Sequence, residues 1–298
     1  MENDVKNLSA KFGLFMKSRR VKKFLFKAIM YVVSIVCSIS FVIPFLWMLS
    51  TSLKEYGEIY AVPITFIPEK FVWSNYREVF AVSEYVNIPL GFLNTLLIAV
   101  PTVTIGVLAS ALAAFAYAKI PFPGRDKIFF AFIATMAIPD IISMIPRFMI
   151  FAELNWVNTW LPLMIPGMFG SAGTVFFTRQ FMKGIPTSLE EAAKLDGLSW
   201  FGIFWRIELP LSTAVIATNF MFGIIGKYND YLGPMLYVNS RNELRTLQQM
   251  IAMLNNTAGT RLGAQMAGSC IAIMPMILLF IAAQKYFVEG ISLSGIKG

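Results

Sequence analysis

The sequence predicts an all-α polytopic membrane protein with six transmembrane helices. Apolar residues make up 57% of the 298 residues and charged residues only 14%, whereas soluble domains are roughly half apolar and a quarter charged. Six apolar runs reach about 20 residues, the length that crosses a bilayer. No polar segment between these runs is long enough to form a soluble domain. We therefore expect residues 1–298 to form a single membrane domain.

The six predicted spans lie near residues 28–50, 89–117, 128–152, 157–181, 211–237 and 266–287. Eight lysines and arginines between Lys6 and Lys27 precede the first span, and such clusters gather on the cytoplasmic side of membranes. An even number of spans returns the chain to the side where it began. We expect a plasma (inner) membrane protein with both termini cytoplasmic and with membrane lipid as a partner. Segments 1–27, 184–210 and 288–298 are then cytoplasmic, and 238–263 is extracellular.

The charge pattern and the missing residue types exclude several functions. The net charge of +8 comes from basic residues concentrated at the ends of the spans, which argues against nucleic acid as a partner. The chain has no histidine, so histidine metal sites and Ser-His or Cys-His catalysis are excluded. Cys37 and Cys270 both fall inside apolar runs, where we expect buried, unpaired thiols. We predict no metal site, no catalytic residues and no cofactor in this chain.

A polar stretch from Pro186 to Pro210 separates the fourth and fifth spans. Thr187 or Ser188 is expected to start a helix as its N-cap. Glu190 and Glu191 follow three residues later, so either register gives a capping box with carboxylates at the positive end of the helix. The stretch therefore predicts a short surface helix.

The same helix is expected to stop abruptly. Ala192 and Ala193 favour helix, and Glu190 can pair with Lys194 one turn later. Gly197 lies where a residue with positive φ ends a helix. An apolar helical turn or two should follow, lying against lipid or other helices and ending before Pro210.

These positions resemble the permease subunits of ATP-binding-cassette importers, whose cytoplasmic loop carries Glu-Ala-Ala, then Gly, then a hydrophobic-Leu-Pro ending. The matching residues here are Glu191, Ala192, Ala193, Gly197, Leu209 and Pro210. The resemblance implies the type I importer permease fold. It also implies that the short helix, with Glu190 and Asp196, is a coupling helix that docks on an ATPase subunit. Without the resemblance, the same residues would predict only a capped connection between two spans.

The resemblance also implies the partners. The chain has no phosphate-binding Gly-x-x-x-x-Gly-Lys-Ser/Thr motif, so ATP and Mg are expected in two separate ATPase subunits. A second, non-identical permease subunit and an extracellular solute-binding protein complete the expected assembly. The C-terminal sequence Gly-Ile-Lys-Gly resembles one half of the maltose-type permease pair, which implies a sugar or oligosaccharide as the solute.

A gradient-driven secondary transporter of a small polar solute is the alternative. Such a transporter is expected to show inverted repeats and acidic residues near the middle of the membrane. We find no internal repeat, and only Asp140 and Asp230 could serve as those acidic residues.

Ionisable residues inside the predicted spans are costly and therefore informative. They are Asp140 and Arg147 on the third span and Lys227 and Asp230 on the fifth. The polar face around Lys227 either joins helices through hydrogen bonds or lines a solute pathway, in which Tyr228 could stack on a sugar ring. The predicted pathway residues are Asn94, Asn219, Lys227, Tyr228, Asn229 and Asp230.

The last outer loop carries an apolar helical stripe of Leu244, Leu247, Ile251 and Leu254. In the resembling permeases this loop reaches the solute-binding protein. That correspondence implies contacts by Asn255, Asn256, Thr257 and Thr260. A helix lying on the bilayer surface is the alternative.

Overall fold

The computed structural model describes residues 19–81, 86–238, 240–256 and 261–295. All regular secondary structure in these ranges is helical, which confirms the predicted all-α class. The longer helices are α2 (Arg19–Ser52), α5 (Ile88–Lys119), α7 (Asp140–Glu153), α9 (Ala172–Met182), α13 (Thr213–Tyr228) and α16 (Leu262–Gly295).

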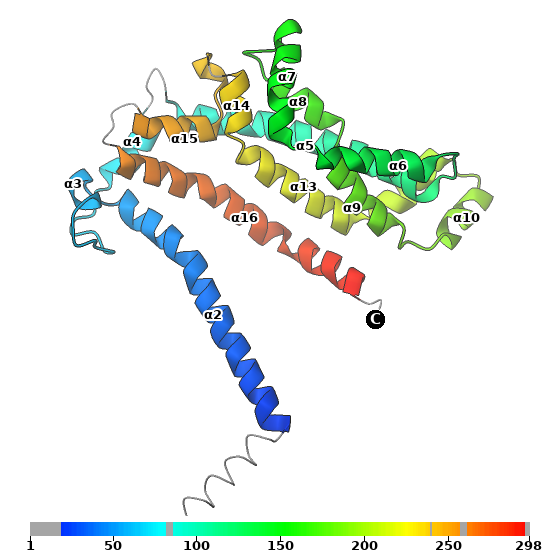
Figure 1. Ribbon diagram of the computed structural model, residues 1–298, viewed down its shortest axis with the longest axis horizontal. Helices are drawn as coiled ribbons and strands as arrows, with labels where there is room; N and C mark the ends of the chain where they lie inside the picture. The colour runs from blue at the N-terminus through cyan, green and yellow to red at the C-terminus, as the bar shows by residue number, and fades with distance from the viewer. Residues whose placement is uncertain (1–18, 82–85, 239, 257–260, 296–298) are drawn as a thin grey trace, which may run out of the picture.

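Helix α5 is the centre of the molecule. Its 32 residues correspond to a length of about 48 Å at a rise of about 1.5 Å per residue. It packs against α8 (Leu161–Met168), α9, α13 and α15 (Leu247–Asn256). Small residues such as Gly106, Ala111 and Ala114 are buried along it, and small residues allow helices in membranes to approach closely. Helix α13 packs between α5 and α16, and α16 in turn contacts α2 (Figure 1).

Four helical segments of the described chain are long and apolar enough to cross a membrane, and two bent pairs raise the number to six if each pair is one span. One pair joins α6 (Arg125–Ala134) and the 3-10 turn η1 (Thr135–Ala137) to α7 with a bend of 95°. The break falls at Pro139, the residue before α7. The other pair bends by 78° between Leu211 and Thr213. The expected six spans are therefore compatible with this architecture.

The fourth and fifth predicted spans are interrupted. Helices α8 and α9 are separated at Gly170, whose φ is 88°. The predicted fifth span, 211–237, is wrong at its end, because α13 stops at Tyr228 and the short α14 (Leu232–Tyr237) follows. Asp230 lies in this break, where its carboxylate accepts a hydrogen bond from the Gly233 amide.

Helix α2 diverges from the other helices (Figure 1). None of the residues in its most apolar stretch is buried within this chain. Its apolar side chains therefore face outward, as those of a membrane span do. Cys37 is exposed on this helix, which corrects the expectation that both thiols are buried.

The loop helices α3 (Tyr56–Ile59), α4 (Ser74–Phe80) and α15 gather at one end of the molecule (Figure 1). Leu247, Ile251 and Leu254 of α15 are buried in one core cluster with Val79. The alternative of a helix lying on the bilayer is therefore wrong for this face, because protein covers it. Leu244 belongs to the separate turn η3 (Asn242–Leu244) rather than to the helix.

Helix α16 continues to Gly295, within the predicted cytoplasmic segment 288–298. Residues 296–298, like residues 1–18 of the basic N-terminal segment, lie outside the described residues.

Candidate functional site

The predicted coupling helix is α10 (Ser188–Leu195), at the opposite end of α5 from α15 (Figure 1). Its C-terminus has the expected left-handed residue, Gly197, with φ of 80°. The Leu198 amide donates to the Ala193 carbonyl and the Gly197 amide to the Lys194 carbonyl, each at 3.0 Å. These two bonds form a Schellman motif, which fixes where the helix ends.

The start of α10 differs from its prediction. Thr187 takes the N-cap position, but its side chain makes no capping hydrogen bond. Backbone bonds from the Glu190 and Glu191 amides to the Thr187 carbonyl close the first turn instead. The predicted capping box is therefore wrong, because Thr187 already has helical backbone angles rather than the extended ones of a side-chain cap.

The two faces of α10 have different neighbours. Glu190 and Ala193 are buried against the rest of the chain, whereas Glu191, Ala192 and Asp196 are exposed. Leu195 is 90% exposed at the end of the helix. Sequence reasoning missed Leu195, although an apolar residue one turn after the exposed Glu191 was a signal for an outward apolar face.

The predicted pair between Glu190 and Lys194 is wrong. The Glu190 carboxylate accepts a hydrogen bond from Lys119, the last residue of α5. The Lys194 ammonium instead lies over the Trp200 ring, 3.6 Å from its centroid. This cation–π contact joins the exposed side of α10 to the second half of the loop.

The second half of the loop is a continuous series of helical turns. These are α11 (Trp200–Ile203), the π-helical turn η2 (Phe204–Glu208) and α12 (Leu209–Leu211). Helix therefore continues through Pro210 rather than ending before it. Pro210 follows the end of the π-helical turn, where the Leu209 amide donates to the Phe204 carbonyl. Phe204 packs on Phe115 of α5 with ring centroids 5.5 Å apart, and Leu209 is half-buried while Pro210 is exposed.

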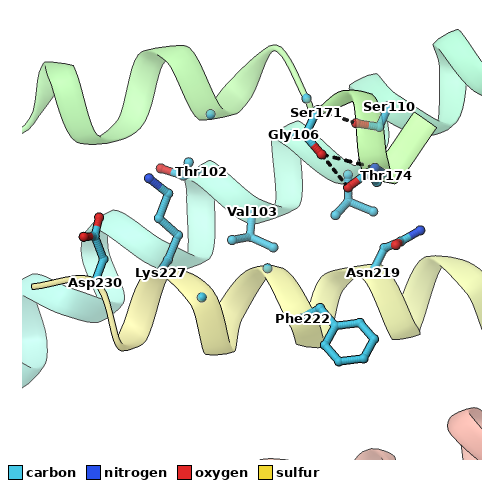
Figure 2. A pocket seen from close by; sticks show the side chains of 15 residues that line it. Thr102, Val103, Gly106, Ser110, Ser171, Thr174, Asn219, Phe222, Lys227 and Asp230 are labelled. Carbon is cyan, nitrogen blue, oxygen red and sulfur yellow. Dashed lines mark hydrogen bonds between the residues drawn. The ribbon is translucent and has the colours of Figure 1, made fainter. Parts of the chain in front are cut away.

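A cavity of about 420 Å³ lies between α5, the break between α8 and α9, and α13 (Figure 2). Its polar lining comes from Thr102, Ser110, Ser171, Thr174, Asn219, Lys227 and Asp230. Glycines let the helices meet here: a Cβ on Gly223 would lie 2.6 Å from Val103, so only glycine fits at that crossing. Small-molecule sites combine an apolar wall with a few polar groups in this way.

A second cavity of about 500 Å³ shares Gly167, Lys227 and Asp230 with the first. Asp140 and Arg147 also line it, joined by an ion pair of 2.9 Å. The four charged residues predicted inside the membrane thus meet around one space. The Lys227 ammonium donates to the Leu163 carbonyl at 2.9 Å, so backbone holds it beside the cavity.

The comparisons with known proteins agree with this geometry. Residues 106–293 match the family described as the binding-protein-dependent transport system inner membrane component. The chain belongs to this family. The family is one of membrane-embedded permease subunits, which confirms the resemblance found in the coupling loop.

Three relatives resemble this permease over most of its length. The lactose transport system permease protein LacG of Rhizobium radiobacter is 30% identical over 84% of this chain and 89% of its own. The probable starch degradation products permease AmyC of Thermoanaerobacterium thermosulfurigenes is 32% identical, covering 91% and 97%. The arabinooligosaccharides permease AraQ of Bacillus subtilis is 29% identical, covering 88% and 92%.

A solved structure has the same fold. The crystal structure of a bacterial ABC transporter involved in the import of the acidic polysaccharide alginate aligns with a TM-score of 0.76. The alignment covers 91% of this permease and 98% of that chain at 22% identity. The likeness supports the predicted importer permease fold.

The predicted pathway residues divide into two groups in this permease. Asn219, Lys227 and Asp230 line the cavity (Figure 2). Tyr228 is buried on the other side of α13, where its hydroxyl donates to the Ala272 carbonyl at 2.7 Å. Asn229 is bonded to the Ile225 carbonyl and to Gln248. The structure therefore places Tyr228 and Asn229 away from the cavity.

Asn94 also has a different environment from the predicted one. It is buried on α5, and its amide donates to the carbonyls of Glu243 and Arg245 at 2.8 and 2.9 Å. These bonds attach the segment before α15 to α5. Of the predicted binding-protein contacts, Thr257 and Thr260 lie outside the described residues, and Asn255 and Asn256 are described only as backbone in α15.

Proposed function

We propose that this permease imports a sugar or oligosaccharide that an extracellular solute-binding protein delivers, with ATP and Mg bound and hydrolysed by two partner ATPase subunits. The observation that carries the proposal is α10. It is a short helix with one face fixed to α5 and the other face exposed, including the almost fully exposed Leu195. An exposed leucine among the charged residues of this face is available for contact with a partner protein.

The proposed docking surface consists of Glu191, Ala192, Leu195 and Asp196. Gly197 fixes the end of the helix, and the buried Glu190 and Ala193 orient it. Leu209 packs against the core cluster that contains Ala193, and Pro210 follows it in the connection to α13. In this reading Glu190 has an internal role, in place of the direct contact with the ATPase that the sequence predicted.

The carbohydrate assignment rests on two separate arguments. The relatives named above are described as transporting lactose, arabinooligosaccharides and starch degradation products. Independently, hydroxyl, amide and charged groups from Ser110, Thr174, Asn219 and Asp230 converge on the cavity. Such groups suit the many hydroxyls of a saccharide. The apolar Val103 of α5 and Phe222 of α13 also line the cavity and suit the faces of sugar rings.

The proposed orientation places α10 and α15 on opposite sides of the membrane. Its length of about 48 Å exceeds the hydrocarbon thickness of about 30 Å, and α10 and α15 contact its opposite ends. With α10 on the cytoplasmic side, segment 238–263 is extracellular, and both termini are cytoplasmic. We propose that a second, non-identical permease subunit completes the pathway, because six spans make only half of one.

A gradient-driven transporter is the weaker proposal. The family is that of binding-protein-dependent systems, in which a separate protein supplies the solute.

Charge reversal and apolar removal on α10 test the coupling proposal. Glu191→Lys and Leu195→Arg should insert normally but lose the ATPase chains that co-purify with the wild-type permease in mild detergent. Lys127→Glu is the matched control, because Lys127 is an exposed charge on α6, and α6 lies at the same end of the molecule as α10 (Figure 1). Unchanged co-purification and ATP-driven uptake in both α10 variants would refute the docking surface.

Substitutions along α13 test the pathway proposal. Lys227→Met and Asp230→Asn should change which glycans stimulate ATP hydrolysis by the assembled complex, because both side chains line the cavity. Tyr228→Phe is the control, since Tyr228 is on the buried side of the same helix. If all three variants keep the wild-type glycan profile, the face of α13 with Lys227 and Asp230 serves helix packing and not solute recognition.

A further inference from the structure

The buried side of the coupling loop contains a cluster of charges, two of which, Lys119 and Glu208, have no role in the proposed function. The Lys119 ammonium is bonded to the Glu190 carboxylate, lies 3.3 Å from the Glu208 carboxylate, and donates to the Ile185 carbonyl at 2.8 Å. The side chains of Lys119, Glu190 and Glu208 are 3%, 6% and 0% exposed. Charges are buried in this way only when they are paired.

The three partners of Lys119 come from different parts of one loop: two accept its hydrogen bonds and the third, Glu208, forms an ion pair with it. Ile185 lies before α10, Glu190 lies within it, and Glu208 lies in the π-helical turn η2. A single cation at the last residue of α5 therefore contacts both halves of the loop. A π-helical turn is a frequent feature of functional sites, and here it turns the Glu208 carboxylate towards Lys119.

The charges of the cluster are unequal, because two carboxylates face one ammonium. Glu208 lies in η2, before the bend that leads into α13, and its side chain is fully buried. Arg206 is the basic residue nearest to Glu208 in the sequence, but its side chain is exposed. Removal of Lys119 alone would leave two buried carboxylates without their cation, which is strongly unfavourable.

Helix α5, which carries Lys119 at its end, also lines the proposed sugar pathway. Thr102, Gly106 and Ser110 of α5 line the first cavity, two to five turns before Lys119. The core around the joint is closely packed: Phe115 of α5 contacts both Trp200 and Phe204 of the loop. Because closely packed groups and buried ion pairs resist deformation, a displacement of the coupling loop is passed on to α5.

We propose that Lys119 is a positioning residue that joins the coupling loop to α5, so that a displacement of α10 moves the helix lining the substrate cavity. This inference rests on the proposed function, since it requires α10 to receive the motion of an ATPase. It assigns to Glu190 and Glu208 the role of internal anchors, distinct from the outward docking surface of Glu191 and Leu195.

Transport and ATP hydrolysis measured together test the joint. In complexes reconstituted into liposomes, Lys119→Met should retain ATPase activity but import at least tenfold fewer solute molecules per ATP. Lys119→Arg should restore most of that ratio, because it keeps the buried positive charge. Lys183→Met is the matched control, as Lys183 is an exposed lysine beside the loop, and its ratio should equal that of the wild type.

Lys119→Met can fail to fold for the electrostatic reason given above, so a second variant removes all three charges. Lys119→Met combined with Glu190→Gln and Glu208→Gln leaves no unpaired charge and should insert normally. It should still show the tenfold loss of transport per ATP. A wild-type ratio in this triple variant, or in Lys119→Met, would overturn the proposal.

A distance measurement separates this inference from the proposed function. Spin labels at Leu195→Cys on α10 and Leu112→Cys on α5, both exposed positions, are introduced after Cys37 and Cys270 are replaced by serine. The distance distribution of the full chain in nanodiscs should be at least twofold broader in the triple variant than in the wild type. Equal widths would refute the joint even if ATP-driven import is observed. A broadened distribution without any ATP-driven import would retain the joint and refute only the proposed function.

Discussion

Gly197 provides the sharpest test of how the coupling helix is held. Its φ of 80° lies in the left-handed region, which costs other L-residues about 1–2 kcal/mol. A Cβ built on Gly197 would meet nothing within 4 Å. The whole cost of Gly197→Ala is therefore conformational, because no steric contact adds to it.

A cost of about 1–2 kcal/mol raises the population of an open state roughly 5- to 30-fold. The amides of Gly197 and Leu198 make the two bonds that close the end of α10. Their hydrogen exchange should therefore accelerate by the same factor in Gly197→Ala if opening is local. Gly197→Asn should accelerate exchange less, since asparagine tolerates the left-handed region better.

The assay is amide exchange followed by mass spectrometry on the permease in nanodiscs, with peptides that cover residues 186–200. Gly57→Ala is the matched control, because a Cβ there also meets nothing within 4 Å, but Gly57 lies within helix α3 without a positive φ. Its own peptide should exchange no faster than in the wild type. The reasoning would be refuted if Gly197→Ala and Gly197→Asn both left exchange at residues 197 and 198 unchanged.

Two further predictions concern the packing around α5. Gly106→Ala should lower the thermal midpoint of the permease by the equivalent of about 1–3 kcal/mol, because the new methyl group would overlap the Gly167 carbonyl oxygen; Gly226→Ala, with open space around it, should not. Asn94→Ala should cost about 1–3 kcal/mol by leaving the carbonyls of Glu243 and Arg245 without their buried donor. Faster trypsin cleavage after Arg241 or Arg245 would report this loss, and Asn229→Ala should show none.

Local patterns in the sequence were sufficient for the class of the fold and for the family. The length and spacing of the apolar runs predicted a helical membrane protein, because the bilayer sets the length of each span. The break at Pro139 and the end of α10 at Gly197 were also predictable, since proline and glycine restrict or free the backbone of the residue itself.

Side-chain roles in the two candidate sites depended on distant parts of the chain. Glu190 was predicted to pair with Lys194 because the two are one turn apart, but Lys119 lies 71 residues away in sequence and supplies a buried partner. Sequence reasoning also missed Glu208, although a lone charge in an apolar turn was a signal that it has a partner.

Contacts with distant parts of the chain also decide which of the predicted pathway residues line the cavity. Asn219, Lys227 and Asp230 were recognised as unusual for a span, and they line the cavity. Tyr228 looked equivalent in sequence, yet its hydroxyl is satisfied by Ala272, 44 residues later. Helical periodicity shows which residues share a face, whereas only the packing of α13 between α5 and α16 decides which face meets a cavity and which meets protein.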